Sequence, residues 1–352
     1  MAYFPSVSIV SPTYNCNLEL FKRSLDSIKN QDFPRNLVEH IVIDGGSKNG
    51  TLALAESYGC KIIERPDLIC DTQQRISLGA KASKNDIILF LETDNIAVGR
   101  DWLQKATFPF IETKEIFCTY SMYNAFFADM PLLTKYFALI GVNDALLYYL
   151  GKTEKIPLDE NIYNKGQVIK EYPTYYLVKI LYKELPPMGD NGFFIRKKIL
   201  EKVNKDPKKF IHVDIFANLV KEGYNSFGVI KNSIVHYAGS NILEQYRKRI
   251  AIKRNFYEDK RSKRTYLTFN PHSKRDMVNL IKFIFFSLTF ILPFLRSVKG
   301  YLKVRELAWF LHPIVCFIAL FMYTKSELDY LLQKCKWFTK FTKEVKQITS
   351  YE

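Results

Sequence analysis

The chain has 352 residues, of which 47% are hydrophobic and 25% charged, a composition that suits packed cores and excludes an intrinsically disordered protein. The net charge of +15 is unevenly distributed, because residues 1–240 carry 29 basic and 27 acidic side chains whereas residues 241–352 carry 22 and 9. We therefore expect a nearly neutral domain over 1–240 and a basic region over 241–352, and not a nucleic-acid-binding protein that is basic throughout.

The cysteines and the N-terminus indicate the cellular compartment in which the protein is expected. The six cysteines are scattered, so the sequence predicts neither a disulfide framework nor a structural zinc site, and it suits a reducing compartment. The first residues pass directly into a strand pattern with no basic region before it, so no secretion signal is expected.

Four short apolar runs alternate with helical patterns in the first 120 residues. They lie at residues 7–10, 40–43, 61–63 and 86–91. Continuous apolar strands that are separated by helices are typical of a parallel sheet buried on both faces, so the predicted fold class is α/β.

Polar residues directly follow three of these strands. They form the sequences Pro12-Thr13-Tyr14-Asn15, Asp44-Gly45-Gly46-Ser47 and Glu92-Thr93-Asp94-Asn95. Ligands bind at the carboxyl ends of the strands in an open parallel sheet, so these residues are predicted to line a polar cleft. Each group alone could equally consist of turn residues and helix caps.

The acidic triplet Glu92-Thr93-Asp94 gives the most specific prediction. It follows an apolar strand, so its carboxylates should emerge at the rim of the sheet. Hard cations bind to proteins through one or two carboxylates together with substrate phosphates. The sequence therefore predicts that Asp94 holds Mg²⁺ or Mn²⁺ against a diphosphate, where the cation would neutralise the charge of that leaving group.

Three segments resemble the nucleotide-binding motifs of family 2 glycosyltransferases, which have the GT-A fold. The segments are VSIVSPTYN at 7–15, IVIDGGSKNGT at 41–51 and IILFLETDN at 87–95. The resemblance implies a Rossmann-like, mostly parallel central sheet flanked by helices. It also implies transfer of a sugar, with inversion, from a nucleotide-diphosphate sugar to a hydroxyl or phosphate acceptor.

The resemblance further implies roles for individual residues in donor binding. Asp44 would contact the nucleotide base, Glu92 the ribose and Asp94 the metal ion. The other residues expected to contact the nucleotide sugar are Pro12, Thr13, Tyr14, Asn15, Gln74, Arg75 and Thr93. This chain departs from the family pattern in having Glu92 as the first acidic residue of the DXD motif, and Gly45 where a second aspartate is commoner.

The catalytic base has two candidates in the second half of the chain. An inverting transfer needs a base that removes the proton of the attacking acceptor hydroxyl. The resemblance places this base at the start of a helix that ends near Gly223, where the spacing favours His212 and the residue type favours Asp214. Residues two positions apart do not share a helix face, so only one of them is expected to be the base. A carboxylate near a helix N-terminus and a partly buried histidine also have structural explanations.

Two further features are candidates for the sugar and metal sites. Asp190-Asn191-Gly192 with Arg196 resembles the turn and basic residue that lie beside the sugar pocket in the family, although a hairpin turn could have the same sequence. His236 ends the last predicted strand and could reach the metal or the diphosphate, or be an ordinary core or surface histidine. Residues 245–249 resemble the Gln-x-x-Arg-Trp motif of processive synthases only in part, because Lys248 stands at the arginine position and the tryptophan is absent. Synthesis of a polymer is therefore not expected.

The basic region contains two apolar segments, at 277–295 and 307–323, which follow a basic stretch at 247–275. Each is near the lower limit for spanning a bilayer, and the basic stretch suits an anionic cytoplasmic leaflet. We expect a helical tail at the cytoplasmic face of a membrane, with membrane lipids as partners and a glycan or polyprenyl-phosphate-type acceptor. A spanning hairpin would translocate basic residues, so helices that lie in the interface remain an alternative, as do soluble core helices.

Other functions compete with this interpretation. A sugar nucleotidyltransferase would need a glycine-rich basic loop after the first strand, where Pro12-Thr13-Tyr14-Asn15 has neither feature. A non-catalytic membrane-bound scaffold would not need Asp44, Glu92 and Asp94. The basic tail contains no nucleic-acid recognition motif, so no nucleic-acid partner is expected.

Overall fold

The computed structural model describes residues 4–254 and 264–348, and it describes side chains as far as residue 334. Part of the basic stretch predicted at 247–275 therefore lies outside the described residues, as do the first three residues of the chain.

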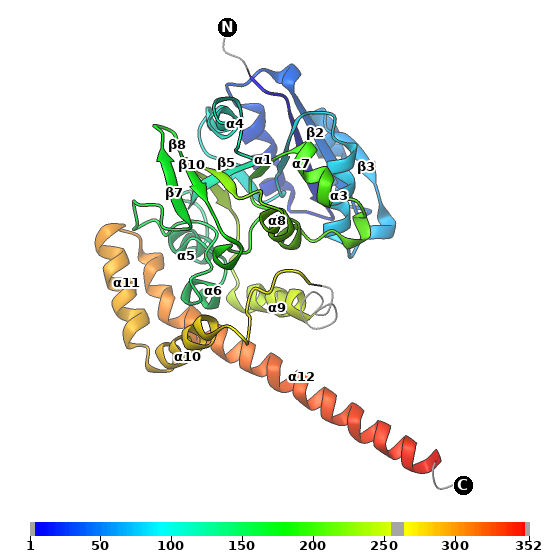
Figure 1. Cartoon of the computed structure of the whole chain (residues 1–352), viewed down its shortest axis with the longest axis vertical. Coiled ribbons are helices and arrows are strands. Elements are labelled where there is room, and N and C mark those ends of the chain that lie inside the picture. The colour runs from blue at the N-terminus through cyan, green and yellow to red at the C-terminus, as the bar shows by residue number, and fades with distance from the viewer. Residues whose placement is uncertain (1–3, 255–263, 349–352) are drawn as a thin grey trace.

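A mixed ten-stranded sheet, in the order β3-β2-β1-β4-β9-β6-β10-β8-β7 with β5 paired to β10, forms the centre of the fold (Figure 1). The strands are β1 Val7–Thr13, β2 Val38–Asp44, β3 Lys61–Glu64, β4 Ile87–Phe90, β5 Asn95–Ala97, β6 Cys118–Ala125, β7 Gln167–Glu171, β8 Tyr175–Lys179, β9 Phe193–Arg196 and β10 Ser226–His236. Strands β1 to β4 pair in parallel, as the sequence predicts. Strand β9 is antiparallel to both of its neighbours, β4 and β6, so the second half of the sheet is mixed.

Helices cover both faces of the sheet. Those of the first 240 residues are α1 Leu18–Lys29, α2 Thr51–Ser57, α3 Thr72–Ala82, α4 Trp102–Glu112, α5 Leu132–Ile140, α6 Ala145–Tyr149, α7 Lys197–Val203 and α8 His212–Lys221. Successive β4 residues point to opposite faces, so Ile88 and Phe90 pack in the core with α3 and α8, while Ile87 and Leu89 pack with α4. This double burial explains the continuous apolar runs in the sequence.

A glycine in α3 fixes how closely that helix approaches the strands. A Cβ atom at Gly79 would overlap the side chains of Val10 in β1 and Ile43 in β2. The close packing sets the N-terminus of α3, which Asp71 caps by accepting from the Gln74 backbone N–H at 2.8 Å, beside the ends of these strands.

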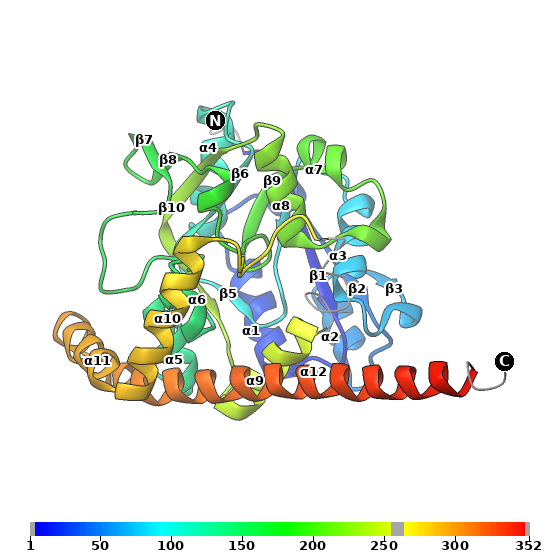
Figure 2. The same ribbon diagram turned by 60° about the horizontal axis from the view of Figure 1, so that its bottom comes forward.

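The tail is helical and bent. It contains α9 Ile242–Lys253, α10 Lys274–Thr289, α11 Ile291–Lys303, a 3₁₀ turn at Leu307–Leu311 and α12 His312–Ile348. Helices α10 and α11 meet at an angle of 87° at Phe290, which has φ of +60°, so the predicted segment 277–295 is divided in two. Figure 2 shows α12 extending along one side of the molecule, with α9 against it.

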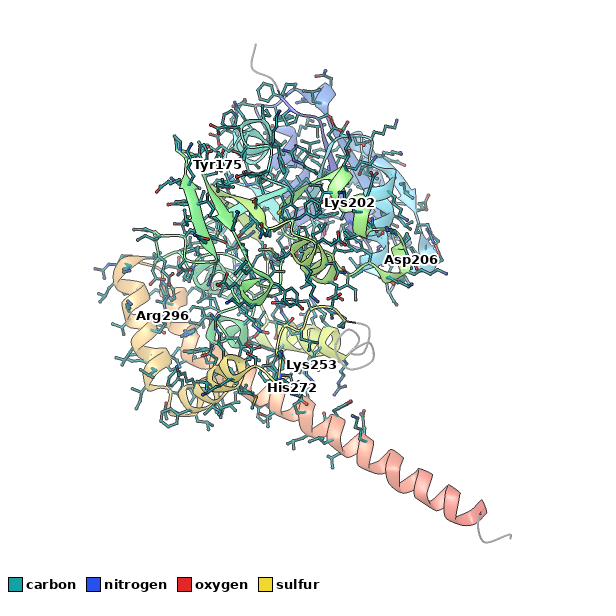
Figure 3. The ribbon with its side chains drawn as sticks, in the orientation of Figure 1. Tyr175, Lys202, Asp206, Lys253, His272 and Arg296 are labelled. Atoms are coloured by element: carbon teal, nitrogen blue, oxygen red, sulfur yellow. The ribbon has the colours of Figure 1, made fainter. Side chains whose placement is uncertain are left out.

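The tail shares one hydrophobic core with α5 and α6. A buried ion pair strengthens this contact: the guanidinium of Arg296, which is labelled in Figure 3, donates to the two Asp159 carboxylate oxygens at 2.6 and 3.0 Å. The two side chains are 15% and 2% exposed. Arg296 therefore ties α11 to the segment that contains Asp159.

One stretch of the tail, Leu307–Lys334, is long and apolar enough to cross a membrane, with a mean hydropathy of 1.8, and 39% of its apolar window is buried in the protein. A core helix of a soluble protein can have the same length and composition, so this feature alone is weak evidence for a membrane span.

Candidate active site

The antiparallel strand β9 brings two distant polar turns together. Phe193 in β9 pairs with Phe90 at the end of β4, and the Gly192 N–H donates to the Phe90 carbonyl at 3.0 Å. The turn before β9 therefore lies beside the acidic triplet that follows β4, and Asn95 Nδ2 donates to Asn191 Oδ1 at 3.2 Å. The predicted residues Glu92, Asp94 and Asp190 thus gather at one edge of the sheet.

His236 joins this acidic cluster because β10 ends there. His236 pairs with Asn95 across the β5–β10 ladder, and its Nε2 lies 3.7 Å from Asp94 Oδ2. Two ligands of one cation lie about 3–4 Å apart when each metal–ligand bond is about 2.1 Å. The pair that the sequence predicts as metal ligands therefore lies at a suitable separation.

The charges of the cluster suit a cation. Burial, followed by the charges of Asp94 and Asp190, raises the pKa of Glu92 well above its ordinary value. Burial also raises the pKa of Asp94, although His236 opposes the shift. Neighbouring buried carboxylates repel each other, and a divalent cation would relieve that repulsion. Within the part of the chain that the structure describes, no three acidic, histidine or cysteine side chains form a complete metal site, so substrate oxygens would have to supply further ligands.

His212, the first residue of α8, lies on the other side of Asp190. Its Nε2 is 3.6 Å from Asp190 Oδ2, and its Nδ1 is 2.9 Å from Gln73 Oε1 at the start of α3. The Gln73 oxygen also accepts from the His212 backbone N–H at 2.8 Å. Sequence reasoning named Gln74 and missed Gln73, which is the residue that contacts the candidate base.

Asp214 has a different environment. Its carboxylate accepts from Arg264 Nε at 2.7 Å, from Arg264 Nη2 at 3.1 Å and from the Tyr266 backbone N–H at 3.0 Å. The Asp214 side chain is only 9% exposed. These contacts join α8 to the segment that follows α9, so Asp214 is engaged in a structural ion pair and is separated from the contacts of His212.

Asp44 is enclosed by the loop that follows β2. Its two carboxylate oxygens accept from Thr13 Oγ1, Ser47 Oγ, and the N–H groups of Gly46 and Ser47, at 2.5–2.7 Å. Burial alone would raise its pKa, but these hydrogen bonds outweigh burial and lower it. Asp44 thus holds the strand-end loops together, and a nucleotide base would have to replace one of these contacts to bind it.

Other residues predicted for the nucleotide site lie around the same loops. Asn15 has φ of +42°, its N–H donates to Ser47 Oγ at 2.7 Å, and its side-chain oxygen accepts from the Lys48 N–H at 2.8 Å. Pro12 is buried within β1, and Tyr14 is exposed.

Arg75 is buried beneath the β2 loop. Its Nη1 donates to the carbonyls of Leu68 and Ile69 at 2.5 and 3.0 Å. A Cβ atom at Gly45 would lie 2.5 Å from this nitrogen, so the glycine that replaces the commoner aspartate makes room for the guanidinium. The charge of Arg75 acts on Asp44 and Glu92 from within the protein.

Arg196 is the predicted site residue that the structure separates from the cluster. Because β9 is antiparallel to β4, Arg196 pairs with Ile87 at the opposite end of β4 from Asp94. Its guanidinium donates to the carbonyls of Ile116 and Phe110 at 2.8 and 2.7 Å. Strand β9 therefore separates Arg196 from the Asp190-Asn191-Gly192 turn with which the resemblance grouped it.

Glu154 and Lys155 form a buried ion pair that sequence reasoning missed. Lys155 Nζ lies 2.8 Å from Glu154 Oε1 and 5.1 Å from the centre of the Tyr120 ring. The side chain of Lys155 is 1% exposed and that of Glu154 is 13% exposed. Burial, opposed by Lys155 and assisted by Asp190, raises the pKa of Glu154. No local pattern in the loosely patterned stretch around 131–182 identifies this pair, because only the fold brings it near Asp190.

A mixed sheet with an acidic edge at the ends of its parallel strands is the arrangement that the resemblance to the GT-A fold implies. Residues 8–203 match the sequence profile described as "Glycosyl transferase family 2", and the chain belongs to that family. This assignment confirms the resemblance that the three strand-end motifs carry.

Curated relatives match part of this chain. A 105-residue segment is 30% identical to "Glycosyltransferase AglE" of Haloferax volcanii and covers 29% of this chain and 34% of that protein. An 80-residue segment is 28% identical to "3-deoxy-manno-octulosonate cytidylyltransferase" of Chloroherpeton thalassium and covers 23% of this chain and 32% of that protein. The matched segments span about a third of the length of these relatives.

The fold is similar to a solved mannosyltransferase, PcManGT of Pyrobaculum calidifontis, in complex with GDP-Man and Mn²⁺. The TM-score is 0.50 with 13% sequence identity, and the match covers 93% of this chain and 88% of that one. At this identity the similarity shows the GT-A fold and not a shared substrate.

Proposed function

We propose that this protein is an inverting glycosyltransferase that moves a sugar from a nucleotide-diphosphate sugar to a hydroxyl or phosphate acceptor at a membrane. The observation that carries the proposal is the convergence of two histidine–aspartate pairs, Asp94 with His236 and Asp190 with His212, at the edge of the sheet where β4 and β10 end and β9 begins. One pair suits a metal ion and the other suits proton removal.

Asp94 and His236 are the residues that would hold Mg²⁺ or Mn²⁺. When bound, the cation would supply positive charge to the diphosphate that leaves the sugar. The Nδ1 of His236 lies 2.8 Å from the Asn143 side-chain amide, which fixes the ring. Metal binding requires a free lone pair on Nε2, so the Asn143 amide would present its oxygen to Nδ1–H in that state.

His212 is the proposed base. The Gln73 oxygen can only accept hydrogen bonds, so Nδ1 of neutral His212 carries the proton and Nε2 keeps its lone pair. This nitrogen faces Asp190, whose negative charge would stabilise the imidazolium that forms when His212 takes the proton of the acceptor hydroxyl. Asp214 is unsuited to this role because Arg264 and Tyr266 occupy its carboxylate.

The tail supports the membrane part of the proposal. Helices α10, α11 and α12 expose many large apolar side chains, although they also pack on α5 and α6. The exposed residues include Ile281, Phe285, Leu288, Ile291, Phe294, Leu295, Phe317, Phe321, Leu328 and Leu332. An apolar surface on a strongly basic region suits helices that lie in an anionic, cytoplasmic membrane interface. A lipid-linked acceptor, such as a polyprenyl phosphate, would lie in the same interface. If the full-length protein remains in the soluble fraction without detergent, this part of the proposal is wrong.

The enzymatic part is tested by incubating the purified protein with a panel of nucleotide sugars and Mn²⁺ and measuring the release of nucleoside diphosphate. We expect one donor to be hydrolysed, and both EDTA and Asp94→Asn to stop the reaction. The exposed Asp129 provides the matched control, so Asp129→Asn should hydrolyse the donor at the normal rate. Release of no nucleoside diphosphate from any donor would favour a non-catalytic scaffold, and release of pyrophosphate from a nucleoside triphosphate would favour a nucleotidyltransferase.

A further inference from the structure

Helices α9 and α12 enclose a hollow of about 400 Å³ outside the acidic cluster. On α9 it is lined by residues 247, 250, 251 and 254, and on α12 by residues 322, 325, 326 and 329. Each set has the i, i+3, i+4, i+7 spacing of one helix face, so the hollow lies between two facing stripes. Lys253, labelled in Figure 3, is at the C-terminal end of α9 beside this site.

Three of the eight residues that line the hollow are cationic. Arg247 and Arg254 from α9 and Lys325 from α12 contribute three positive charges, against the single carboxylate of Asp329. Arg254 Nη2 and Asp329 Oδ2 are 3.8 Å apart, and their side chains are 41% and 43% exposed. An exposed ion pair of this length is weak, so an incoming anion could compete for Arg254 at little cost.

A buried hydroxyl in the same lining has no partner. Ser326 is 2% exposed, and its Oγ makes no hydrogen bond within the part of the chain that the structure describes. A helical serine usually donates to the carbonyl four residues earlier, and a buried hydroxyl without a partner is unfavourable. Because Ser326 lines the hollow, rotation of its side chain would offer this hydroxyl as a donor to a ligand there.

The hollow lies next to the exposed apolar side chains of α12. Phe317, Phe321 and Leu328 form an exposed stripe along α12, and Lys325 and Asp329 lie on the flank next to that stripe. If the apolar stripe enters the acyl region of a membrane, this flank lies at the depth of the lipid headgroups.

We propose that the hollow between α9 and α12 binds the phosphate of an anionic membrane-lipid headgroup. Arginine side chains donate paired hydrogen bonds to phosphate oxygens, Lys325 adds a point charge, and the Ser326 hydroxyl supplies a neutral donor. This inference rests on the membrane placement in the proposed function and adds to it a specific lipid site. It requires no donor sugar, so it can fail while the proposed transfer stands.

The test measures how many molecules of a short-chain phosphatidate the full-length protein binds in detergent, by native mass spectrometry, with short-chain phosphatidylcholine as the comparison lipid. We expect saturable binding of one phosphatidate. Ser326→Ala, which changes no charge, should weaken it about tenfold, the size of a hydrogen bond to a charged group. Ser287 is also a buried tail serine whose hydroxyl has no partner among the described residues, and it lies outside the hollow, so Ser287→Ala is the matched control.

A second pair of variants separates the site from general attraction to negative charge. Arg247→Gln with Lys325→Gln should abolish the saturable binding, whereas Lys282→Gln with Lys299→Gln, which removes two exposed tail charges elsewhere, should retain it. Equal binding by the two double variants, or by Ser326→Ala and the wild type, would overturn the proposal. Equally tight binding of inorganic phosphate alone would show that the site takes free phosphate and not a lipid. Donor hydrolysis by the same preparations tests the proposed function independently.

Discussion

The Nδ1 atom of His212 lies 2.9 Å from Oε1 of Gln73, although 139 positions separate the two residues in the chain. Since an amide oxygen cannot donate, this contact leaves the lone pair of neutral His212 on Nε2, the nitrogen that faces Asp190 at 3.6 Å. A glutamine at the start of α3 therefore selects the tautomer of a histidine at the start of α8.

His212→Ala should lower the rate of sugar transfer by about 10²–10⁴, the usual effect of removing a general base, while the affinity for the donor stays close to normal. The measurement is kcat together with the donor dissociation constant.

Asp214→Asn is the contrasting variant. It should retain most of the transfer rate but lower the free energy of unfolding by about 3 kcal/mol, because it replaces the carboxylate of a buried ion pair with a neutral amide. A severe loss of kcat in Asp214→Asn with His212→Ala nearly normal would reverse our assignment of the base.

Gln73→Leu should lower kcat about tenfold with little change in the acceptor KM, because neutral His212 would no longer be held in the tautomer that leaves Nε2 free. Gln73→Glu also presents an accepting oxygen, so it should recover most of the rate. If both variants lose activity equally, the contact has only a structural role.

The stability of the metal-free protein should depend on pH through Glu92. Burial and the charges of Asp94 and Asp190 raise its pKa in the folded chain well above the ordinary value of 4.5, so the folded chain holds this proton more tightly than the unfolded chain does. The stability contribution of Glu92 is therefore complete below pH 4.5 and is lost as the pH rises through the raised folded-state pKa.

We accordingly expect the Tm of the wild type to fall relative to that of Glu92→Gln as the pH rises above 4.5 toward neutrality, and Mn²⁺ with a nucleoside diphosphate to reduce that difference. Glu92→Gln should flatten the profile, whereas Glu56→Gln, at an exposed position on α2, should not. Thermal unfolding across the pH range measures this, and a profile that is unchanged in Glu92→Gln would refute it.

Arg296→Gln should detach or loosen the tail. It removes one partner of a buried ion pair and leaves the Asp159 charge unpaired, which typically lowers the free energy of unfolding by about 3–5 kcal/mol. Urea unfolding and limited proteolysis of the tail are the measurements, and Lys299→Gln, at an exposed position on the same helix, is the control. If Arg296→Gln has no more effect than Lys299→Gln, the tail does not depend on this ion pair for docking.

The sequence predicts those parts of the fold and site that have local signals. Strands β1, β2 and β4 contain short apolar runs, Asp44 ends β2, and Glu92 and Asp94 lie just beyond β4, so the parallel half of the sheet and its acidic edge can be inferred without a structure.

Long-range contacts have no such signal. The antiparallel insertion of β9 carries Arg196 away from the cluster. The ion pair of Asp214 with Arg264 and the contact of Gln73 with His212 join residues 50 and 139 positions apart. The bend of 87° at Phe290 divides an apolar segment that looks continuous in the sequence.

The most direct test of the central claim is calorimetric titration of the protein with its preferred nucleotide sugar, with and without Mn²⁺. If Asp94 and His236 hold the cation against the diphosphate, Mn²⁺ should strengthen donor binding in the wild type. His236→Ala should weaken that enhancement about 10–100-fold, in line with the loss of one contact to a bound metal, and Asp94→Asn should remove it. Donor affinity that is independent of Mn²⁺ in the wild type, or equally enhanced by Mn²⁺ in Asp94→Asn, would contradict the account.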